Sequence, residues 1–147
     1  MAILIYWKHE NYRSDIASGL RFNFNSKQNR LHTKTEIGED VFVVSGIRRD
    51  SGLEIYLVAH LVISGKSLNS GNNKYGKYKI LADRKRSKYF SIEGEALTPM
   101  LSNLTSIRHF GDRIDRYAQA FQTLRKLNNH DSELIKAFAD FLTPLEK

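Results

Sequence analysis

The sequence predicts an α+β protein in which a β-rich part precedes a helical part. Short apolar runs, rich in β-branched and aromatic residues, recur over about residues 1–92. Apolar residues then recur at helical spacing over about residues 93–147. The 147 residues, 41% of them hydrophobic, suffice for one domain or for one domain with a helical appendage. We therefore expect a β domain over residues 1–107 and a pair of helices over residues 108–147.

Strands are expected wherever a short apolar run is bounded by turn-forming residues. These runs are Ala2–Trp7, Val41–Val44, Leu53–Ile63, Tyr78–Ala82 and Tyr89–Ile92. The second and third runs flank residues 45–52, where Asp50-Ser51-Gly52 marks a turn, so they are expected to form a hairpin. Residues 8–35 and the Gly-, Ser- and Asn-rich residues 64–76 indicate loops, the former with room for one short strand or helical turn.

Three helices are expected after Gly94. The first covers about residues 96–104, with Pro99 near its first turn. The second is an amphipathic helix over about residues 112–127, and the third begins at an Asp131 or Ser132 cap and ends before Pro144. A short turn joins the last two helices, which predicts an antiparallel pair that packs on the sheet or on a second chain.

The positive charge of the chain is unevenly placed. The formal net charge is +7, and residues 1–91 contain 16 basic and 8 acidic residues against 7 and 8 in residues 92–147. Residues 74–88 alone contain seven cations and one anion. A basic field of this kind favours a polyanion, most often nucleic acid, because binding releases condensed counterions.

Aromatic residues lie in or beside the basic segments, which suits nucleic acid because rings stack on bases while cations contact phosphates. They are Trp7, Tyr12, Phe22, Phe24, Tyr75, Tyr78, Tyr89 and Phe90. We expect Phe22 and Phe90 to be core residues, as is Phe42. Those that adjoin loops and carry polar tips are expected to be exposed, namely Trp7, Tyr12, Tyr75 and Tyr89.

Composition argues against several other classes of protein. Cysteine is absent, which excludes disulfides, a cysteine nucleophile, a Cys-ligated zinc site and an iron–sulfur cluster. The five histidines show no metal-ligand spacing, and no phosphate-binding Gly-rich loop or nucleophile elbow occurs, so no metal or cofactor is expected. No apolar run approaches a membrane span, and the first residues do not resemble a signal peptide, so we expect a cytoplasmic protein without a membrane partner.

One weak pattern is typical of metal-dependent nucleases. Asp83-Arg84-Lys85 places a carboxylate and a lysine after an apolar strand, and Glu54 or Asp40 could supply a second carboxylate. Two carboxylates can hold Mg²⁺ while a lysine steadies the developing charge. An Asp beside several cations is more often an ion-pair partner, so we assign no catalytic residue and keep a nuclease that uses Asp83 and Lys85 as an alternative.

Residues 1–107 resemble the PUA-like superfamily, and within it the EVE-type domains that read modified bases. The resemblance lies in the opening Ile5-Tyr6-Trp7 strand, the long polar loop after it, and the strand Ile37-Gly38-Glu39-Asp40-Val41-Phe42-Val43-Val44-Ser45-Gly46. The strand over residues 56–63, the later Tyr78–Asp83 strand and a short Leu-rich helix continue the same order.

The resemblance implies a small, closed, mixed β-barrel whose mouth accepts one nucleobase, often flipped from a duplex and often modified. The pocket residues that it implies are Trp7, Tyr12 and Phe24 for stacking, with Asn11, Asn23, Ser45 and Asp83 for the base edge. The expected phosphate contacts are Lys8, Arg48, Arg49, Lys77, Arg84, Lys85, Arg86 and Lys88.

We therefore expect a nucleic-acid-binding module that reads a modified or flipped base in DNA, as the recognition part of a restriction or defence system. An RNA-binding protein of the same fold, for tRNA-like RNA, is the first alternative, and the nuclease is the second. Residues 111–147 could instead mediate a homodimer or hold an effector protein, which would make the helices the working surface.

Overall fold

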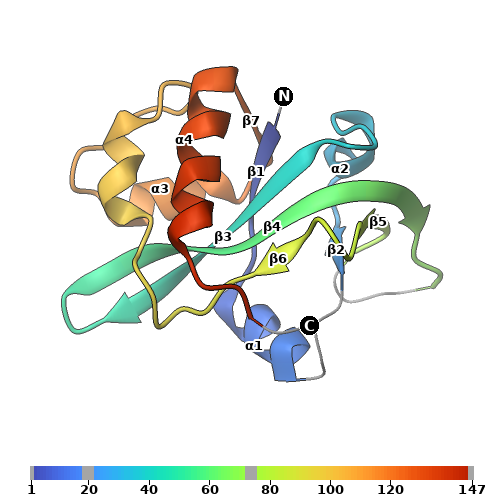
Figure 1. Ribbon diagram of the computed structural model, residues 1–147, viewed down its shortest axis with the longest axis horizontal. Coiled ribbons are helices and arrows are strands. Elements are labelled where there is room, and N and C mark those ends of the chain that lie inside the picture. The colour runs from blue at the N-terminus through green and yellow to red at the C-terminus, as the bar shows by residue number, and fades with distance from the viewer. Residues whose placement is uncertain (1, 18–21, 72–75, 146–147) are drawn as a thin grey trace.

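The computed structural model describes residues 2–17, 22–71 and 76–145, and shows a mixed α+β fold (Figure 1). Within these residues a seven-stranded sheet has the order β2-β5-β4-β3-β1-β7, with β6 beside β4. Its strands are β1 (Ala2–Tyr6), β2 (Asn23–Ser26), β3 (Asp40–Arg49), β4 (Gly52–Leu68), β5 (Tyr78–Ala82), β6 (Lys88–Tyr89) and β7 (Arg125–Leu127). The helices are α1 (His9–Ala17), α2 (Arg30–Thr33), the 3₁₀ helix η1 (Thr98–Asn103), α3 (Ile114–Phe121) and α4 (Asn129–Phe141).

The long strand β4 joins the two halves of the sheet. It pairs antiparallel with β3 up to Val62 and then with β5 from Ile63 to Leu68. The expected hairpin is confirmed, with Asp50 and Ser51 at the turn and Gly52 at a φ of +115°, a conformation that glycine adopts without strain. The register shifts between Val43 and Val44 and again between Ile63 and Gly65, and such bulges bend a sheet (Figure 1).

Both faces of the central strands are covered, which explains why their sequences are continuously apolar rather than alternating. In β1, Ile3 and Ile5 face one core while Ala2 and Leu4 face the other. The first, here the aromatic core, lies on the α1 side and contains Trp7, Tyr12, Phe22, Phe24 and Tyr89 among its aliphatic neighbours. The second, here the helical core, packs Phe42, Leu57 and Phe90 against η1, α3 and α4, which Figure 1 shows grouped on one side of the β3–β4 ribbon.

The expected closed barrel is not confirmed. Strands β2 and β7 end the strand order, so hydrogen bonds do not close the sheet within the described residues. The sheet instead curls until β2 approaches the end of β1, where the ring centroids of Trp7 and Phe24 are 5.7 Å apart. The packing of these two rings connects β2 to the end of β1.

Several segments differ from their expected secondary structure, among them residues 64–68, which continue β4 instead of beginning a loop. Residues 8–35 contain α1, β2 and α2 rather than mostly loop. The helix expected over residues 112–127 ends at Phe121, and Arg125–Leu127 form β7, which pairs antiparallel with β1. The two last helices are thus separated by a strand, and residues 108–147 contribute to the main sheet. None of the helices in the described ranges has the length and hydropathy needed to cross a bilayer.

The start of α4 is fixed by a buried carboxylate. Asn128, rather than the expected Asp131 or Ser132, caps the helix, with its side-chain oxygen accepting from the main-chain N of Asp131 at 2.8 Å. The fully buried Asp131 carboxylate accepts hydrogen bonds from the main-chain N of Thr105 (2.8 Å) and Ser106 (2.6 Å) and from both hydroxyls. Burial alone would raise the pKa of Asp131, but these hydrogen bonds outweigh it and hold the pKa well below its usual range.

We expect Asp131→Asn to lower the free energy of unfolding by about 2–3 kcal/mol, because four donors lose a charged acceptor. Urea unfolding at pH 7 measures this. Below a pH of about 4, the ordinary Asp pKa, the unfolded wild-type chain takes up a proton that the folded chain does not. The free energy of unfolding of the wild type therefore falls as the pH is lowered below about 4, and its difference from that of Asp131→Asn becomes smaller.

The control for this prediction is Asp115→Asn, since Asp115 forms an exposed ion pair with Arg113 and should be nearly silent. Equal unfolding midpoints for Asp131→Asn and wild type at pH 7 would contradict the role given to Asp131.

Candidate functional site

A cleft of about 550 Å³ lies between β2 and the end of β1, where the curled sheet is open. Its walls come from segments that are far apart in the chain: the end of β1 and the start of α1, β2 with the residues that follow it, the end of β4, β5, and the α3–β7 connection. The lining residues are Ile5, Tyr6, Trp7, Lys8, Asn11, Asn23, Phe24, Asn25, Ser26, Lys27, Gln28, Leu31, Asn69, Lys79, Gln122 and Leu124.

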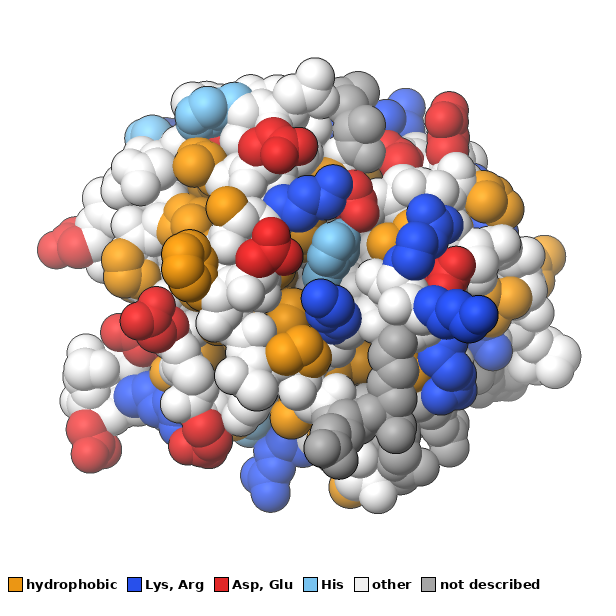
Figure 2. Space-filling model, viewed as in Figure 1, with side chains coloured by type: hydrophobic (Ala, Val, Ile, Leu, Met, Phe, Trp, Pro, Cys, Tyr) orange, Lys and Arg blue, Asp and Glu red, His pale blue; other side chains and the backbone are white. Residues whose placement is uncertain are grey.

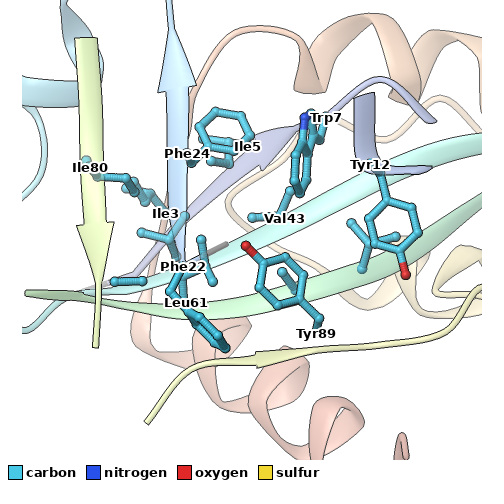
Figure 3. Close-up of a cluster of buried hydrophobic side chains, with 14 of the residues drawn as sticks. Ile3, Ile5, Trp7, Tyr12, Phe22, Phe24, Val43, Leu61, Ile80 and Tyr89 are labelled. Carbon is cyan, nitrogen blue, oxygen red and sulfur yellow. The ribbon is translucent and has the colours of Figure 1, made fainter. Parts of the chain in front are cut away.

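One wall of the cleft is aromatic and rigid. Trp7 lies between Tyr12 and Phe24, with ring centroids 5.9 Å and 5.7 Å away and both rings nearly perpendicular to the indole (Figure 3). Only 9% of Trp7 and 7% of Phe24 is exposed, and both line the cleft. A planar ligand would therefore meet ring surfaces whose positions are already fixed by edge-to-face packing.

The other walls are polar without being acidic. Six amide side chains line the cleft together with three lysines, Lys8, Lys27 and Lys79, and no carboxylate is among the described lining residues. Amides can donate to and accept from the edge of a base, and lysines contact phosphate as point charges. The cleft thus combines apolar contact, neutral hydrogen bonding and positive charge.

The structure brings together some of the residues expected in a base pocket. Trp7, Asn11, Asn23 and Phe24 line the cleft, and so does Lys8, which was expected to contact phosphate. Two other expected phosphate contacts, Lys77 before β5 and Lys88 in β6, are exposed but do not line it.

Tyr12, Ser45 and Asp83 do not line the cleft. Tyr12 is buried beside Trp7, donates its hydroxyl to the carbonyl oxygen of Phe90 at 2.5 Å, and has a pKa raised by burial to about 12. Ser45 is fully buried in β3, and its hydroxyl makes no hydrogen bond within the described residues.

The expected exposure of three aromatic residues is wrong. Trp7, Tyr12 and Tyr89 are all buried, because they pack with other rings and with aliphatic side chains in the aromatic core. Tyr75 lies outside the described residues. The expectation that Phe22, Phe42 and Phe90 are core residues is confirmed.

The turn between β5 and β6 presents a group of cations on a hydrogen-bonded backbone. Asp83 Oδ1 accepts from the main-chain N of Lys85 (2.9 Å) and Arg86 (3.2 Å), and Oδ2 accepts from Arg86 Nε at 3.3 Å. The main-chain N–H of Lys85, followed by that of Arg86, lowers the pKa of Asp83. The carboxylate therefore organises the turn and leaves the side chains of Arg84, Lys85 and Arg86 exposed. In Figure 2, Lys and Arg side chains gather on the right of the view, over β5 and the end of β4.

Arg48 and Arg49 lie apart from the cleft. They end β3 at the tip of the β3–β4 hairpin, which Figure 1 shows at the opposite end of the molecule from β2 and β5. Arg49 donates from Nε to the Tyr56 hydroxyl at 3.2 Å and from Nη2 to the carbonyl oxygen of Ile92 at 2.7 Å. These bonds hold the hairpin against the segment after β6.

Of the second carboxylates named for a nuclease, Asp40 has other partners and Glu54 lies near the β3–β4 hairpin. Asp40 accepts from His60 Nε2 at 2.8 Å and from Lys136 Nζ at 3.3 Å, and the His60 hydrogen bond is the main cause of its lowered pKa. Glu54 lies beside Arg49 and Tyr56 near the hairpin. Over the described part of the chain, no three His, Asp or Glu side chains are placed to hold a metal ion.

Several cleft residues were missed from the sequence. Asn25 continues the alternation of Phe22, Asn23 and Phe24, so extending that period-2 pattern by one step would have found it. Asn69 and Gln122 had no local signal, because only the pairing of β4 with β5 and the fold of the α3–β7 connection bring them to the cleft.

Gly76 fixes the β4–β5 connection against β2. Its φ is +113°, and a Cβ there would lie 2.3 Å from the carbonyl carbon of Ser26. We expect Gly76→Ala to lower the free energy of unfolding by about 1–3 kcal/mol more than Gly52→Ala, because overpacking adds to the backbone strain. Gly52 is the matched control, since its φ is +115° and a Cβ there would have no atom within 4 Å among the described residues. Equal unfolding midpoints for the two variants would show that this close approach is unimportant.

No protein-family model matches the chain, and no curated protein is significantly similar to it. The functional argument therefore depends on the residues of the cleft and of the basic turn.

Proposed function

We propose that the protein binds nucleic acid and holds a single base in the cleft between β1 and β2. The observation that carries this proposal is the composition of the cleft: a wall formed by Trp7 and Phe24 faces amides and lysines without a carboxylate among the described lining residues. Proteins that read an extruded base combine aromatic or apolar contact with hydrogen bonds to the base edge. Neutral amides suit an uncharged base, and the lysines suit the phosphates attached to it.

The distribution of charge supports a polyanion as the partner. Lys8, Lys27 and Lys79 lie at the cleft itself. The β5–β6 turn adds Arg84, Lys85 and Arg86, and the main-chain hydrogen bonds to Asp83 fix its backbone. A backbone that passes the cleft could continue across this turn, so that one base enters while neighbouring phosphates contact the cations.

Duplex DNA that carries a flipped or modified base is the favoured ligand. The resemblance to PUA-like and EVE-type domains supports this choice, with the open side of the curled sheet standing in the place of the barrel mouth. The same cleft chemistry would accept a single-stranded base of RNA, so structured RNA belongs in the test. The proposal does not extend to cleavage, because Asp83 caps a turn and Asp40 is held by His60 and Lys136.

The contribution of the basic turn is tested by the double variant Arg84→Ala/Lys85→Ala. We expect it to weaken binding to a 20-base-pair duplex irrespective of sequence, and to reduce the slope of log K against log salt by about 1 for each phosphate that is no longer neutralised. Fluorescence anisotropy at several salt concentrations measures both. The double variant Arg116→Ala/Lys126→Ala, which removes an exposed arginine of α3 and an exposed lysine of β7, is the control. Equal weakening in both variants would point to net charge rather than to this turn.

Occupancy of the cleft is tested through Trp7, the only tryptophan of the chain. We expect a duplex with one unpaired base to change the emission of Trp7 more than the fully paired duplex does. Phe24→Leu should weaken binding of the unpaired base by about 1–3 kcal/mol, the effect of removing one stacking ring. Phe121→Leu is matched, since it removes a buried ring from the helical core instead.

Absence of any anisotropy or emission change at low salt, with DNA or with RNA, would overturn the proposed function. A response to tRNA-like RNA alone would assign the cleft to RNA.

A further inference from the structure

We infer that one wall of the cleft is a fixed hydrogen-bond donor surface, and that it selects bases with a ring carbonyl over adenine. This inference rests on the proposed function, since it concerns which base the cleft accepts. It is carried by three asparagines, Asn69, Asn25 and Asn23, whose amides form a chain from the β4–β5 connection to β2. The donor-to-acceptor direction of these hydrogen bonds decides which amide atoms face a ligand.

The chain is anchored at Asn69. Asn69 Nδ2 donates to the carbonyl oxygen of Gly76 at 2.9 Å and to Asn25 Oδ1 at 2.8 Å. A main-chain carbonyl can only accept, so the amide of Asn69 has one possible orientation. Its backbone is also held, because the main-chain N of Asn69 donates to the carbonyl oxygen of Lys77 at 2.8 Å.

The orientation passes from Asn69 to the cleft. Asn25 Oδ1 is the acceptor for Asn69, so Asn25 Nδ2 points the other way, toward Asn23 Oδ1 at 3.5 Å. The side-chain oxygen of Asn23 therefore faces Asn25, which leaves Asn23 Nδ2 as the atom that can face a ligand. Within the described residues this Nδ2 makes no hydrogen bond, and Asn23 lines the cleft.

A ligand on this wall therefore meets donors. Asn23 Nδ2 offers N–H groups, and the ammonium group of Lys79, on the strand beside it, can only donate. Guanine, cytosine, thymine and uracil each carry at least one carbonyl oxygen that can accept such a bond. Adenine has no carbonyl and accepts only at ring nitrogens, and its N1 and N7 each lie beside the exocyclic amine, which would place a donor against the second donor of the wall.

The test uses four duplexes that differ only in one unpaired base, G, C, T or A, placed opposite an abasic site. Binding is followed by anisotropy and by Trp7 emission at one salt concentration. We expect the duplexes with unpaired G, C or T to bind about tenfold more tightly than the duplex with unpaired A, within the range that one base-edge contact supplies.

Asn23→Asp replaces the hydrogen-bond donor of this wall with an acceptor and changes the shape of the side chain little. The carboxylate still accepts from Asn25 Nδ2 but offers an acceptor to the ligand, so the preference should shift toward adenine. Asn103→Asp, at the exposed end of η1, adds the same charge elsewhere and should keep the wild-type ranking. Asn69→Ala is a second variant. It removes the residue that fixes the orientation of the Asn25 amide, so this amide can rotate by about 180°. The differences in affinity among the four duplexes should then become smaller, while binding itself persists.

The possible outcomes distinguish a failure of the donor wall from a failure of the proposed function. Equal affinity for all four bases, together with a Trp7 response, would overturn the donor wall and leave base binding intact. A uniform loss of affinity in Asn23→Asp, with the ranking unchanged, would also overturn it, because that is an effect of charge alone. No binding by any duplex or RNA would overturn the proposed function itself.

Discussion

The pairing of the long strand β4 is the constraint on which the rest of the structure depends. β4 pairs with β3 along its first part, with β5 along its last part, and with β6 at Ala59 and His60. It thereby fixes the positions of both walls of the cleft: β3 carries β1 and Trp7, while β5 carries β2 and Phe24. A slip of one residue in β4 would move every apolar side chain of this strand to the opposite core.

The two cores explain where the aromatic residues are found. The aromatic core lies on the side of the sheet that the short helices α1 and α2 cover. Large rings fill such a space with few residues, which is why Tyr12 and Tyr89 are buried despite their polar tips. Tyr12 can be buried because the carbonyl oxygen of Phe90 accepts its hydroxyl.

The strands of the central sheet could be predicted from the sequence, whereas the elements around them could not. β1, β3, β4 and β5 form where short apolar runs predict them, since burial on both faces leaves a clear signal. α1 was missed because most of its residues are polar. β7 could not be predicted, because Leu124 and Leu127 continue the helical spacing of the apolar residues of α3 although both lie beyond the end of that helix.

The candidate site divides in the same way. Trp7, Asn11, Asn23 and Phe24 could be named because they lie in or beside the segments that resemble a base-reading domain. Their neighbours across the cleft depend on strand register and on the path of distant connections, which a single sequence does not reveal. The family resemblance itself stays a prediction.

The open side of the sheet gives the cleft a mechanical property that a closed barrel would lack. Strands joined by a ladder keep a spacing of about 4.8 Å, and separating them breaks several hydrogen bonds together. Over the part of the chain that the structure describes, β2 and β1 have no such ladder between them. An exposed hydrogen bond, 2.8 Å long, spans the two sides of the cleft from Gln28 Nε2 to the carbonyl oxygen of Gln122. Within the described residues, the two sides of the mouth are therefore held by the packing of Trp7 on Phe24 and by a side-chain hydrogen bond, so the width of the mouth depends on side chains rather than on a strand ladder.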